Sequence, residues 1–429
     1  MSRAKIWTVL MLACAAPVFI ATPGCEVPTD MPPGNGNDPV YNNTTDRTNN
    51  NASFLGADAC GACHPGIAAE HSIHAHAFQL NRVEGGPPEF PEEADRAGVP
   101  NPPDGVDWSQ VSYVIDGYTK SAQFIDLDGF VYVTGTNGLE TQWNLEFPPN
   151  GTEAGFVEYE SGRTTPKPYD YESFVRHTTG PQPFDADNPM FQENRPGFAG
   201  TWEEAGVQCE ACHGPGSKHV PNPPARNAFV DTSAKFCGEC HSQPFDSDGS
   251  AIEAVDGFIK PYAQYPELLA SGAHAALSCL TCHDPHKSVT YDRENALRKT
   301  CQDCHPTQDM ARHQGLTFVR GDYVEQLSCE SCHMSFAARS GSQGAVDTVG
   351  SVARVGDTRT HIFRINPSNT DFTAMFNEDM TEVAKDANGR AAVTLDFVCL
   401  RCHNGVGNAF ELTVTSASAV TATMHPDGP

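Results

Sequence analysis

The sequence predicts a mainly α-helical and irregular fold, with a small antiparallel β element in the N-terminal half. Three observations lead to this fold class. Only 39% of the 429 residues are hydrophobic, whereas ordinary globular chains carry about 45–50%. A short cysteine–histidine motif recurs along the chain, and a long cysteine-free interval near the N-terminus carries strand signals. We therefore expect something other than aliphatic side chains to fill part of the interior.

The first residues have the pattern of an export signal. Arg3 and Lys5 precede an apolar run over residues 6–21, which is shorter than the about 20 apolar residues that a membrane-spanning helix needs. We assign residues 1–24 as the signal peptide. Cys25 follows Gly24 as in the lipid-attachment box of bacterial lipoproteins, which makes it a candidate lipid anchor, although the residues before Gly24 depart from that box. Residues 25–53 are rich in Pro, Gly, Asn and Thr and are expected to form a flexible tether.

Fourteen of the sixteen cysteines form seven CxxC pairs, each followed by a histidine. The pairs are Cys60/Cys63, Cys209/Cys212, Cys237/Cys240, Cys279/Cys282, Cys301/Cys304, Cys329/Cys332 and Cys399/Cys402. Two intervening residues place both sulfurs on one side of a helical turn, where they can form thioethers with one haem, and the next histidine is then the proximal iron ligand. The proximal ligands are His64, His213, His241, His283, His305, His333 and His403. The sequence thus predicts seven covalently bound haem c groups and a chain packed around them.

Zinc ribbons and disulfides are the competing interpretation of these cysteines, because CxxC pairs also bind zinc in groups of four thiolates. Zinc gives no reason for a histidine directly after every pair. Histidine accounts for only 17 of the 429 residues, so seven such positions do not arise by chance.

Seven irons need a second axial ligand, and ten histidines remain to supply it. Four of them lie close to a motif and are assigned as distal ligands: His219, His274, His286 and His313. A histidine so near to one haem usually cannot reach the far face of the same iron, so each is expected to serve a neighbouring haem. Methionine is the alternative axial ligand, although core packing is the more common role of methionine.

The segment GADACGACHPGIAAEHSIHAHAF resembles the opening motif of the multihaem c-type cytochromes related to the tetrahaem electron carriers of ammonia-oxidising bacteria. The stretches WSQVSYVIDGYTKSAQFIDLDGFVYV, GTWEEAGVQCEACHGPGSKHV and RTHIFRINP are similar to later parts of that pattern, and together they cover much of residues 57–370. The resemblance implies that His76 and His361 are distal ligands. It leaves His74 as an alternative, at a position where the family has serine.

One segment departs from the family pattern. Relatives often carry a CxxCH before Thr-Thr-Gly, whereas this chain reads SFVRHTTG, with Ser173 and Arg176 at the cysteine positions. No thioether can form there, so the resemblance implies a lost eighth haem. His177 is retained, either as a further distal ligand or as an ordinary polar residue.

The spacing of the motifs divides the chain. Residues 54–205 are expected to hold one haem and a small β-rich insertion, because three β-branched and aromatic runs are broken there by Asp116-Gly117 and Asp128-Gly129, which are turn signals. The Pro-rich stretches 87–104 and 181–196 are expected to be extended loops. Residues 206–411 hold six motifs, and residues 412–429 form a tail.

The charge balance favours some partners over others. Asp and Glu number 54 against 27 Lys and Arg, giving a net charge of −27, which repels nucleic acid and favours solubility and basic partners. We expect an exported electron-transfer conduit in the periplasm, anchored at the outer membrane or outside the cell, working with redox partner proteins that include other multihaem cytochromes. The alternatives are a redox enzyme with one open haem that acts on a small nitrogen or sulfur compound, and a subunit of a self-assembled conductive filament.

Overall fold

A computed structural model describes residues 52–223, 230–243, 249–340 and 354–425. The predicted signal peptide, Cys25 and nearly all of the predicted tether lie outside the described residues. Within these ranges, no helix combines the length and the apolar character that a bilayer span requires.

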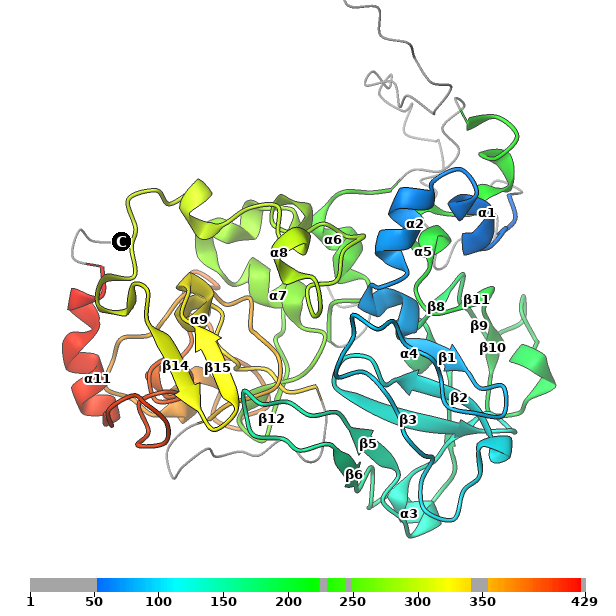
Figure 1. Cartoon of the computed structure of the whole chain (residues 1–429), viewed down its shortest axis with the longest axis horizontal. Coiled ribbons are helices and arrows are strands. Elements are labelled where there is room, and N and C mark those ends of the chain that lie inside the picture. Colours follow the sequence, from blue (N-terminus) through cyan, green and yellow to red (C-terminus); the bar gives the residue numbers. More distant parts are fainter. Residues whose placement is uncertain (1–51, 224–229, 244–248, 341–353, 426–429) are drawn as a thin grey trace, which may run out of the picture.

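The N-terminal half is built on an antiparallel sheet of seven strands (Figure 1). The main path runs β1-β2-β3-β4-β7, and β5 pairs with both β3 and β6. The strands are β1 Leu80–Arg82, β2 Val111–Asp116, β3 Ser121–Asp126, β4 Phe130–Val131, β5 Gln142–Asn144, β6 Gly155–Val157 and β7 Lys167–Pro168. The antiparallel β element expected from the sequence is therefore present, and it contains more strands than the three runs suggested.

The turn between β2 and β3 explains why the sequence has Asp-Gly there. Asp116 and Gly117 both have positive φ, 53° and 87°, and glycine adopts this conformation without a steric penalty. The Asp116 carboxylate accepts hydrogen bonds from the backbone N–H groups of Tyr118 and Thr119, both at 2.9 Å. A side chain at Gly117 would also approach Val99 to 2.9 Å. The tight turn therefore sets the register of the two longest strands.

Both faces of the sheet are buried. One face packs Tyr113 and Ile125 against Tyr169, Phe198 and Trp202. The other face packs Val114, Phe124 and Val111 against Val99, which lies in the first Pro-rich stretch. That stretch contains no strand or long helix, as expected, and its apolar residues cover the sheet.

Helices are short throughout the described part of the chain, and none of them exceeds seven residues. They are α1 Ala57–Gly61, α2 Pro65–His71, α3 Thr134–Asn137, α4 Tyr171–Phe174, α5 Cys209–His213, α6 Ala234–Gly238, α7 Gln264–Leu269, α8 Arg293–Ala296, α9 Cys329–His333, α10 Leu395–Val398 and α11 Val414–Val420. The expected combination of short helices and irregular chain is present, and the helices are the smaller part of it. Turns and irregular segments dominate, because each cysteine motif needs only one helical turn.

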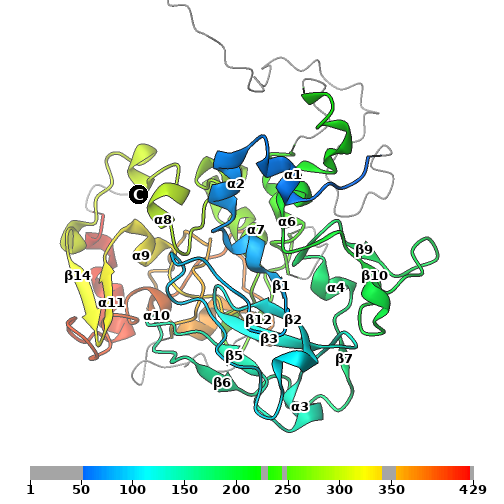
Figure 2. The same cartoon turned by 45° about the vertical axis from the view of Figure 1, so that its right-hand side comes forward.

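Four two-stranded ribbons complete the fold: β8 Thr178–Thr179 with β11 Glu204–Ala205, β9 Gln182–Pro183 with β10 Gly200–Thr201, β12 Ala254–Val255 with β13 Phe258–Ile259, and β14 Thr317–Arg320 with β15 Tyr323–Gln326. The β14–β15 hairpin and α11 lie at the end of the molecule opposite the large sheet in both views (Figures 1 and 2). A second core, around Ile259, Ile362 and Phe397, fills the C-terminal half.

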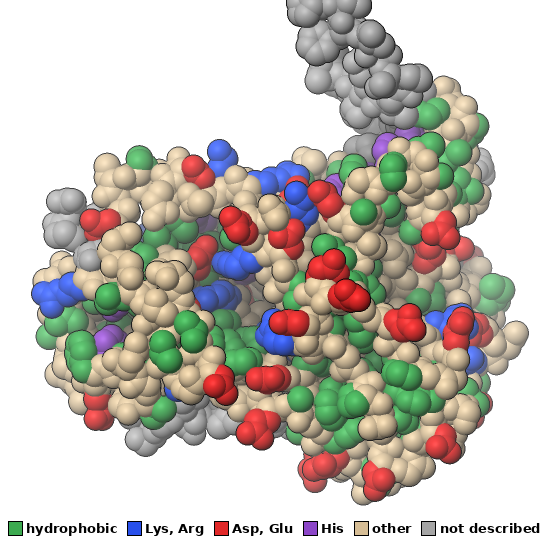
Figure 3. All heavy atoms as spheres, viewed as in Figure 1, with side chains coloured by type: hydrophobic (Ala, Val, Ile, Leu, Met, Phe, Trp, Pro, Cys, Tyr) green, Lys and Arg blue, Asp and Glu red, His purple; other side chains and the backbone are tan. Residues whose placement is uncertain are grey.

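The two halves share an interface. The Tyr291 hydroxyl donates to the Tyr118 carbonyl at 2.8 Å, and Phe147 packs edge-on against Phe336 with ring centroids 5.6 Å apart. Figure 3 shows acidic side chains spread over one face, with Lys and Arg gathered toward its middle. The cysteine motifs are therefore held by a scaffold to which both halves contribute.

Candidate cofactor sites

Each of the seven CxxCH motifs forms one helical turn. In five motifs the backbone N–H of the histidine donates to the carbonyl of the first cysteine, at 2.9 Å for His64 and 3.0 Å for His403, for example. The other two motifs coincide with α5 and α9. One turn brings both cysteine side chains to the same side of the backbone, which is the geometry that the sequence predicted.

Small polar residues before the motifs help to start these turns. The Ser233 side chain accepts a hydrogen bond from the Phe236 backbone at the start of α6. Thr300 and Ser328 form reciprocal capping boxes before Cys301 and Cys329. Such caps satisfy backbone N–H groups that a short helix leaves unpaired.

Every motif histidine faces a second histidine across a gap of nearly constant width. The ring centroids of the seven pairs are 5.8 to 6.4 Å apart. The pairs are His64–His219, His213–His286, His241–His76, His283–His361, His305–His274, His333–His425 and His403–His313. Two metal–nitrogen bonds of about 2 Å, with a ring radius on either side, require roughly 6 Å between centroids. The residues present therefore fit one iron between each pair of imidazoles.

Three motif histidines have one ring nitrogen engaged in a hydrogen bond. Nδ1 of His241 lies 3.1 Å from the Gln264 side-chain oxygen. Nδ1 of His333 and His403 lie 2.8 and 2.7 Å from the backbone carbonyls of Phe363 and Phe410. Because a carbonyl can only accept, Nδ1 carries the proton in the last two, and Nε2 keeps its lone pair for a metal.

The six histidines assigned from the sequence as distal ligands all lie opposite a motif histidine. His76, His219, His274, His286, His313 and His361 occupy six of the seven opposing positions. In each case the partner motif differs from the nearest motif in sequence, which is the arrangement that the sequence predicted for His219, His274, His286 and His313. The pairing therefore links distant segments of the chain.

The seventh opposing ring belongs to His425, which the sequence interpretation did not assign. Residues 412–429 were expected to form a tail, yet α11 lies within them and is followed by His425, whose ring stacks 5.8 Å from His333. Because this segment is polar, nothing in its composition indicated that it would fold and place His425 at a site. The one signal available from the sequence was the arithmetic of seven sites against six assigned partners.

The two alternative distal ligands lie elsewhere. The His74 ring contacts His71 and His76, and its Nδ1 accepts a hydrogen bond from the His76 backbone at 2.9 Å. Nδ1 of His177 lies 2.9 Å from the Tyr169 hydroxyl. Neither ring forms a pair with a motif histidine in the described structure.

Aromatic side chains surround His177, in the segment where the sequence resemblance implied a lost eighth haem. The His177 and Tyr169 rings stack with centroids 6.1 Å apart. The Arg176 guanidinium lies 5.6 Å from the Tyr262 ring. Tyr169 in turn packs against Phe174, Phe198 and Trp202. His177 is thus a partly buried residue hydrogen-bonded to Tyr169 in this structure.

Thiols of consecutive motifs are neighbours along the whole series. Electrostatic interactions between thiols join the first motif to the second, the third to the fourth and the fifth to the sixth: Cys60 with Cys209, Cys237 with Cys279, and Cys301 with Cys329. Electrostatic contacts link the remaining neighbours: Cys212 with Cys240, Cys282 with Cys304, and Cys332 with Cys399. Each motif therefore interacts with the next one in the sequence.

Glu210 connects the segment before the first motif to the second motif through hydrogen bonds. It lies inside the second motif, is only 1% exposed, and accepts hydrogen bonds from the backbone N–H groups of Leu55, Gly56 and Gly216 at 2.9, 2.8 and 2.6 Å. Glu204 adds a bond from the Ala57 N–H at 3.1 Å. These carboxylates accept hydrogen bonds from the backbone N–H groups at the start of α1, which has no side-chain cap of its own.

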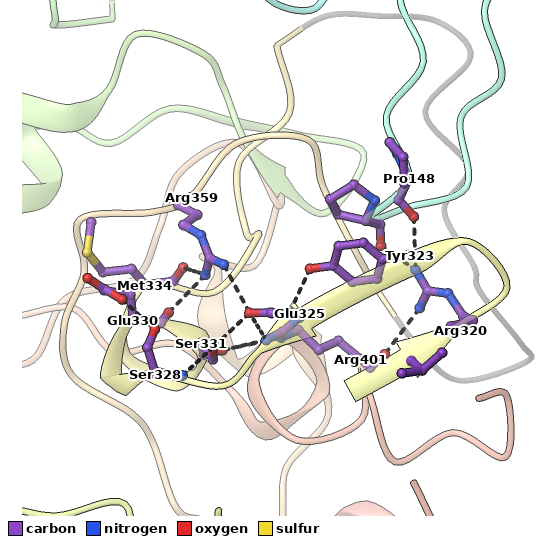
Figure 4. A network of polar contacts seen from close by, with 12 residues as sticks. Pro148, Arg320, Tyr323, Glu325, Ser328, Glu330, Ser331, Met334, Arg359 and Arg401 are labelled. Carbon is purple, nitrogen blue, oxygen red and sulfur yellow. Dashed lines mark hydrogen bonds and ion pairs between the residues drawn. The ribbon is translucent and has the colours of Figure 1, made fainter. Parts of the chain in front are cut away.

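A buried ionic network joins the last two motifs (Figure 4). Both terminal nitrogens of Arg401, which lies between Cys399 and Cys402, donate to Glu325 at 2.7 and 2.9 Å. Arg359 and the Ser331 hydroxyl donate to the same carboxylate at 3.0 and 2.7 Å. Because Ser331 belongs to the sixth motif, one carboxylate positions two neighbouring sites.

The described residues contain no cluster of three or more His, Cys, Asp or Glu side chains arranged to hold a metal ion. The cysteines of the seven motifs are all free thiols. Neither the four-thiolate clusters nor the disulfides of the competing interpretation are found in this part of the chain.

Comparison with known proteins shows which fold this chain shares. No family model matches the chain. The solved structure of the Wolinella succinogenes octahaem sulfite reductase MccA superposes with a TM-score of 0.55 at 18% identity, over 85% of this chain and 69% of that one. The chain therefore has the fold of a multihaem cytochrome.

Among curated proteins, the dissimilatory sulfite reductase MccA of Wolinella succinogenes is 24% identical over 241 residues. This match covers 46% of the chain and 33% of that enzyme, so it spans a third of the relative's length. The outer cell wall cytochrome OcwA gives a TM-score of 0.48 at 16% identity, over 87% of each chain.

Proposed function

We propose that this protein is a c-type cytochrome that binds seven haems covalently and conducts electrons between redox partners. The observation that carries the proposal is the opposing histidine at all seven motifs, 5.8 to 6.4 Å from the motif ring. With both axial positions of an iron filled, a site can exchange electrons but offers no place for a substrate.

The residues of this chain would have three roles in haem binding. The cysteine pairs would hold each haem through thioethers, the motif histidines would be the proximal ligands, and the seven opposing histidines, His425 included, would be the distal ligands. Haem supplies reversible one-electron chemistry when bound. The oxygen atoms that engage Nδ1 of His241, His333 and His403 would keep these three rings oriented and would raise the basicity of the nitrogen that faces the iron.

The series of neighbouring thiols supports a single path from the first site to the seventh. Site one lies at the N-terminal segment beside α1, and site seven lies beside the β14–β15 hairpin and α11, at the other end of the fold. We propose that electrons enter at one of these ends and leave at the other. The resemblance of the opening segment to tetrahaem electron carriers adds support for the carrier function.

Sulfite reduction is the second candidate function, because the curated relative is a sulfite reductase. An enzyme of that kind needs one iron with an open or weakly held axial position. All seven motif histidines have an opposing ring in this chain, which favours the conduit. The alignment covers only 33% of the enzyme, so it gives less support to sulfite reduction than the histidine pairs give to electron conduction.

The decisive experiment starts from the purified, exported protein. Its intact mass should exceed that of the polypeptide by seven haems, and its electron paramagnetic resonance spectrum should contain only low-spin ferric signals. The reduced protein should bind no carbon monoxide and should not turn over sulfite. A colourless protein would refute the haem assignment. A high-spin signal that integrates to one haem, together with sulfite turnover, would favour the enzyme.

We further propose export to the periplasm or the cell surface, with Cys25 as a lipid anchor and residues 25–53 as the tether. Fatty-acid labelling of cells that express the wild type or Cys25→Ala tests the anchor. Label should appear only in the wild type, and the variant should be released from the membrane fraction. Equal labelling of both proteins would exclude this anchor.

A further inference from the structure

His361 differs from several motif histidines in the way its ring is held. Its Nδ1 is buried and has no hydrogen-bond partner. Oε2 of Glu267 lies 3.9 Å from this nitrogen, which is beyond hydrogen-bonding distance. The ring itself is therefore not fixed by a polar contact, and its position depends on the backbone that carries it.

That backbone belongs to an irregular segment, residues 360–363, which lies outside every described helix and strand. Buried backbone groups without secondary structure need partners from elsewhere in the fold. Here the partners come from α7 and the residues just after it.

Glu267 and Ser271 supply these partners. Oε2 of Glu267 accepts hydrogen bonds from the His361 backbone N–H and from the Thr360 hydroxyl, the latter at 2.9 Å. The Ser271 hydroxyl donates to the His361 carbonyl at 2.5 Å and lies 3.3 Å from the Phe363 backbone nitrogen. Glu267 is 2% exposed and Ser271 is also 2% exposed. The two side chains hold both peptide groups of His361.

We infer that Glu267 and Ser271 are positioning residues that hold His361 opposite His283, so that this site keeps its second axial ligand. The inference rests on the proposed haem binding and goes beyond it, because neither residue touches an iron. A carboxylate buried among apolar residues is costly unless it is hydrogen-bonded. Its presence under the His361 backbone is accounted for by this role.

The role does not require a negative charge. Burial raises the pKa of Glu267 to about 8, and both hydrogen bonds are accepted by Oε2, so the contact works with the carboxyl group in either protonation state. Glutamine can accept the same bonds through its side-chain oxygen, whereas alanine cannot. The pair of variants Glu267→Gln and Glu267→Ala therefore separates positioning from charge.

The effect should be centred on one site, with a smaller disturbance next to it. The Phe363 carbonyl is the partner of His333 Nδ1 at 2.8 Å, and the Phe363 ring packs 4.6 Å from His274. Displacing the segment should therefore make the haem at His283 high-spin. The spectra of the sites of His333 and His274 should change less.

The test uses the full chain with its haems attached. In Glu267→Ala, one haem of seven should become high-spin in the ferric state, and the ferrous protein should bind one carbon monoxide per chain. Added imidazole should restore the low-spin spectrum, which general unfolding would not allow. Glu267→Gln should remain low-spin. Glu193→Ala removes a partly buried carboxylate that is bonded to Arg82 in β1 and Tyr113 in β2 and has no contact with His361 among its hydrogen bonds. It should leave the spin state unchanged.

Two further variants keep the inference falsifiable. His361→Ala should give the same single high-spin haem and shows what complete ligand loss looks like. Ser271→Ala, a smaller change, should bind a fraction of one carbon monoxide per chain even if Glu267→Ala does not accumulate. The inference is overturned if both Glu267→Ala and Ser271→Ala match the wild type while His361→Ala does not. A wild type without haem overturns the proposed function instead.

Discussion

Replacing Glu325 with glutamine tests the buried network between the last two motifs. The Glu325 side chain is 8% exposed. Burial alone would raise its pKa, but the hydrogen bonds and charge of Arg401, helped by Arg359, outweigh burial and lower the pKa from 4.5 to about 2. At about 1.4 kcal/mol for each tenfold change, this corresponds to roughly 3 kcal/mol of stability at neutral pH.

The sign of the pH dependence follows from the lowered pKa. The unfolded chain binds a proton at Glu325 near pH 4.5, whereas the folded protein resists protonation until about pH 2. The contribution is therefore complete above about pH 4.5 and is lost as the pH falls toward 2. Glu325→Gln should lower the free energy of unfolding by about 3 kcal/mol at pH 7 and by much less at pH 2.5, because it leaves the buried Arg401 without its counter-charge.

Guanidinium unfolding at several pH values, followed by circular dichroism, measures this difference. Asp386→Asn is the matched control, because hydrogen bonds from Arg390 lower the pKa of Asp386 to about 2 as well, but on an exposed surface where solvent screens the pair. The control should change stability little at any pH. Equal stability of Glu325→Gln and wild type at pH 7, or an equal loss at pH 7 and 2.5, would refute the reasoning.

Three more predictions address other parts of the fold. His425→Ala should convert one haem to high spin, whereas His177→Phe should not, and optical spectra of both ferric proteins decide this. Glu210→Ala leaves three backbone N–H groups without their acceptor, so proteolysis near α1 should become faster while the last sites keep their spectra. Burial lowers the pKa of Lys120 from 10.5 to about 8, so the folded state gives up this proton first and stability should rise with pH between these values; Lys120→Met should flatten that rise in thermal unfolding.

The motifs themselves could be identified from the sequence because their chemistry is local. Two residues between the cysteines and a histidine directly after them, as in Cys60-Gly-Ala-Cys63-His64, specify one helical turn whatever surrounds it. The antiparallel sheet was accessible for a similar reason, since Asp116-Gly117 is a turn signal that acts over a few residues. Local sequence thus determined the cysteine pair and the proximal histidine of each site.

The pairing of those motifs with their second histidines was decided by tertiary structure. His76 lies 12 residues after His64 yet faces His241, and His425 reaches back to His333. Nothing in the composition of residues 412–425 predicted that α11 would fold there and bring a ring to the sixth site. His177 was a possible distal ligand by sequence, but in the fold its ring stacks on Tyr169.

The physical reason is the range of the interactions. A CxxCH turn is stabilised by hydrogen bonds between residues four apart, so its formation is encoded within five residues. An opposing histidine is positioned by packing and hydrogen bonds from distant segments, as Glu267, 94 residues away in the sequence, holds the backbone of His361. Those contacts exist only once the chain has collapsed around its core, and they decide which rings come to lie about 6 Å apart.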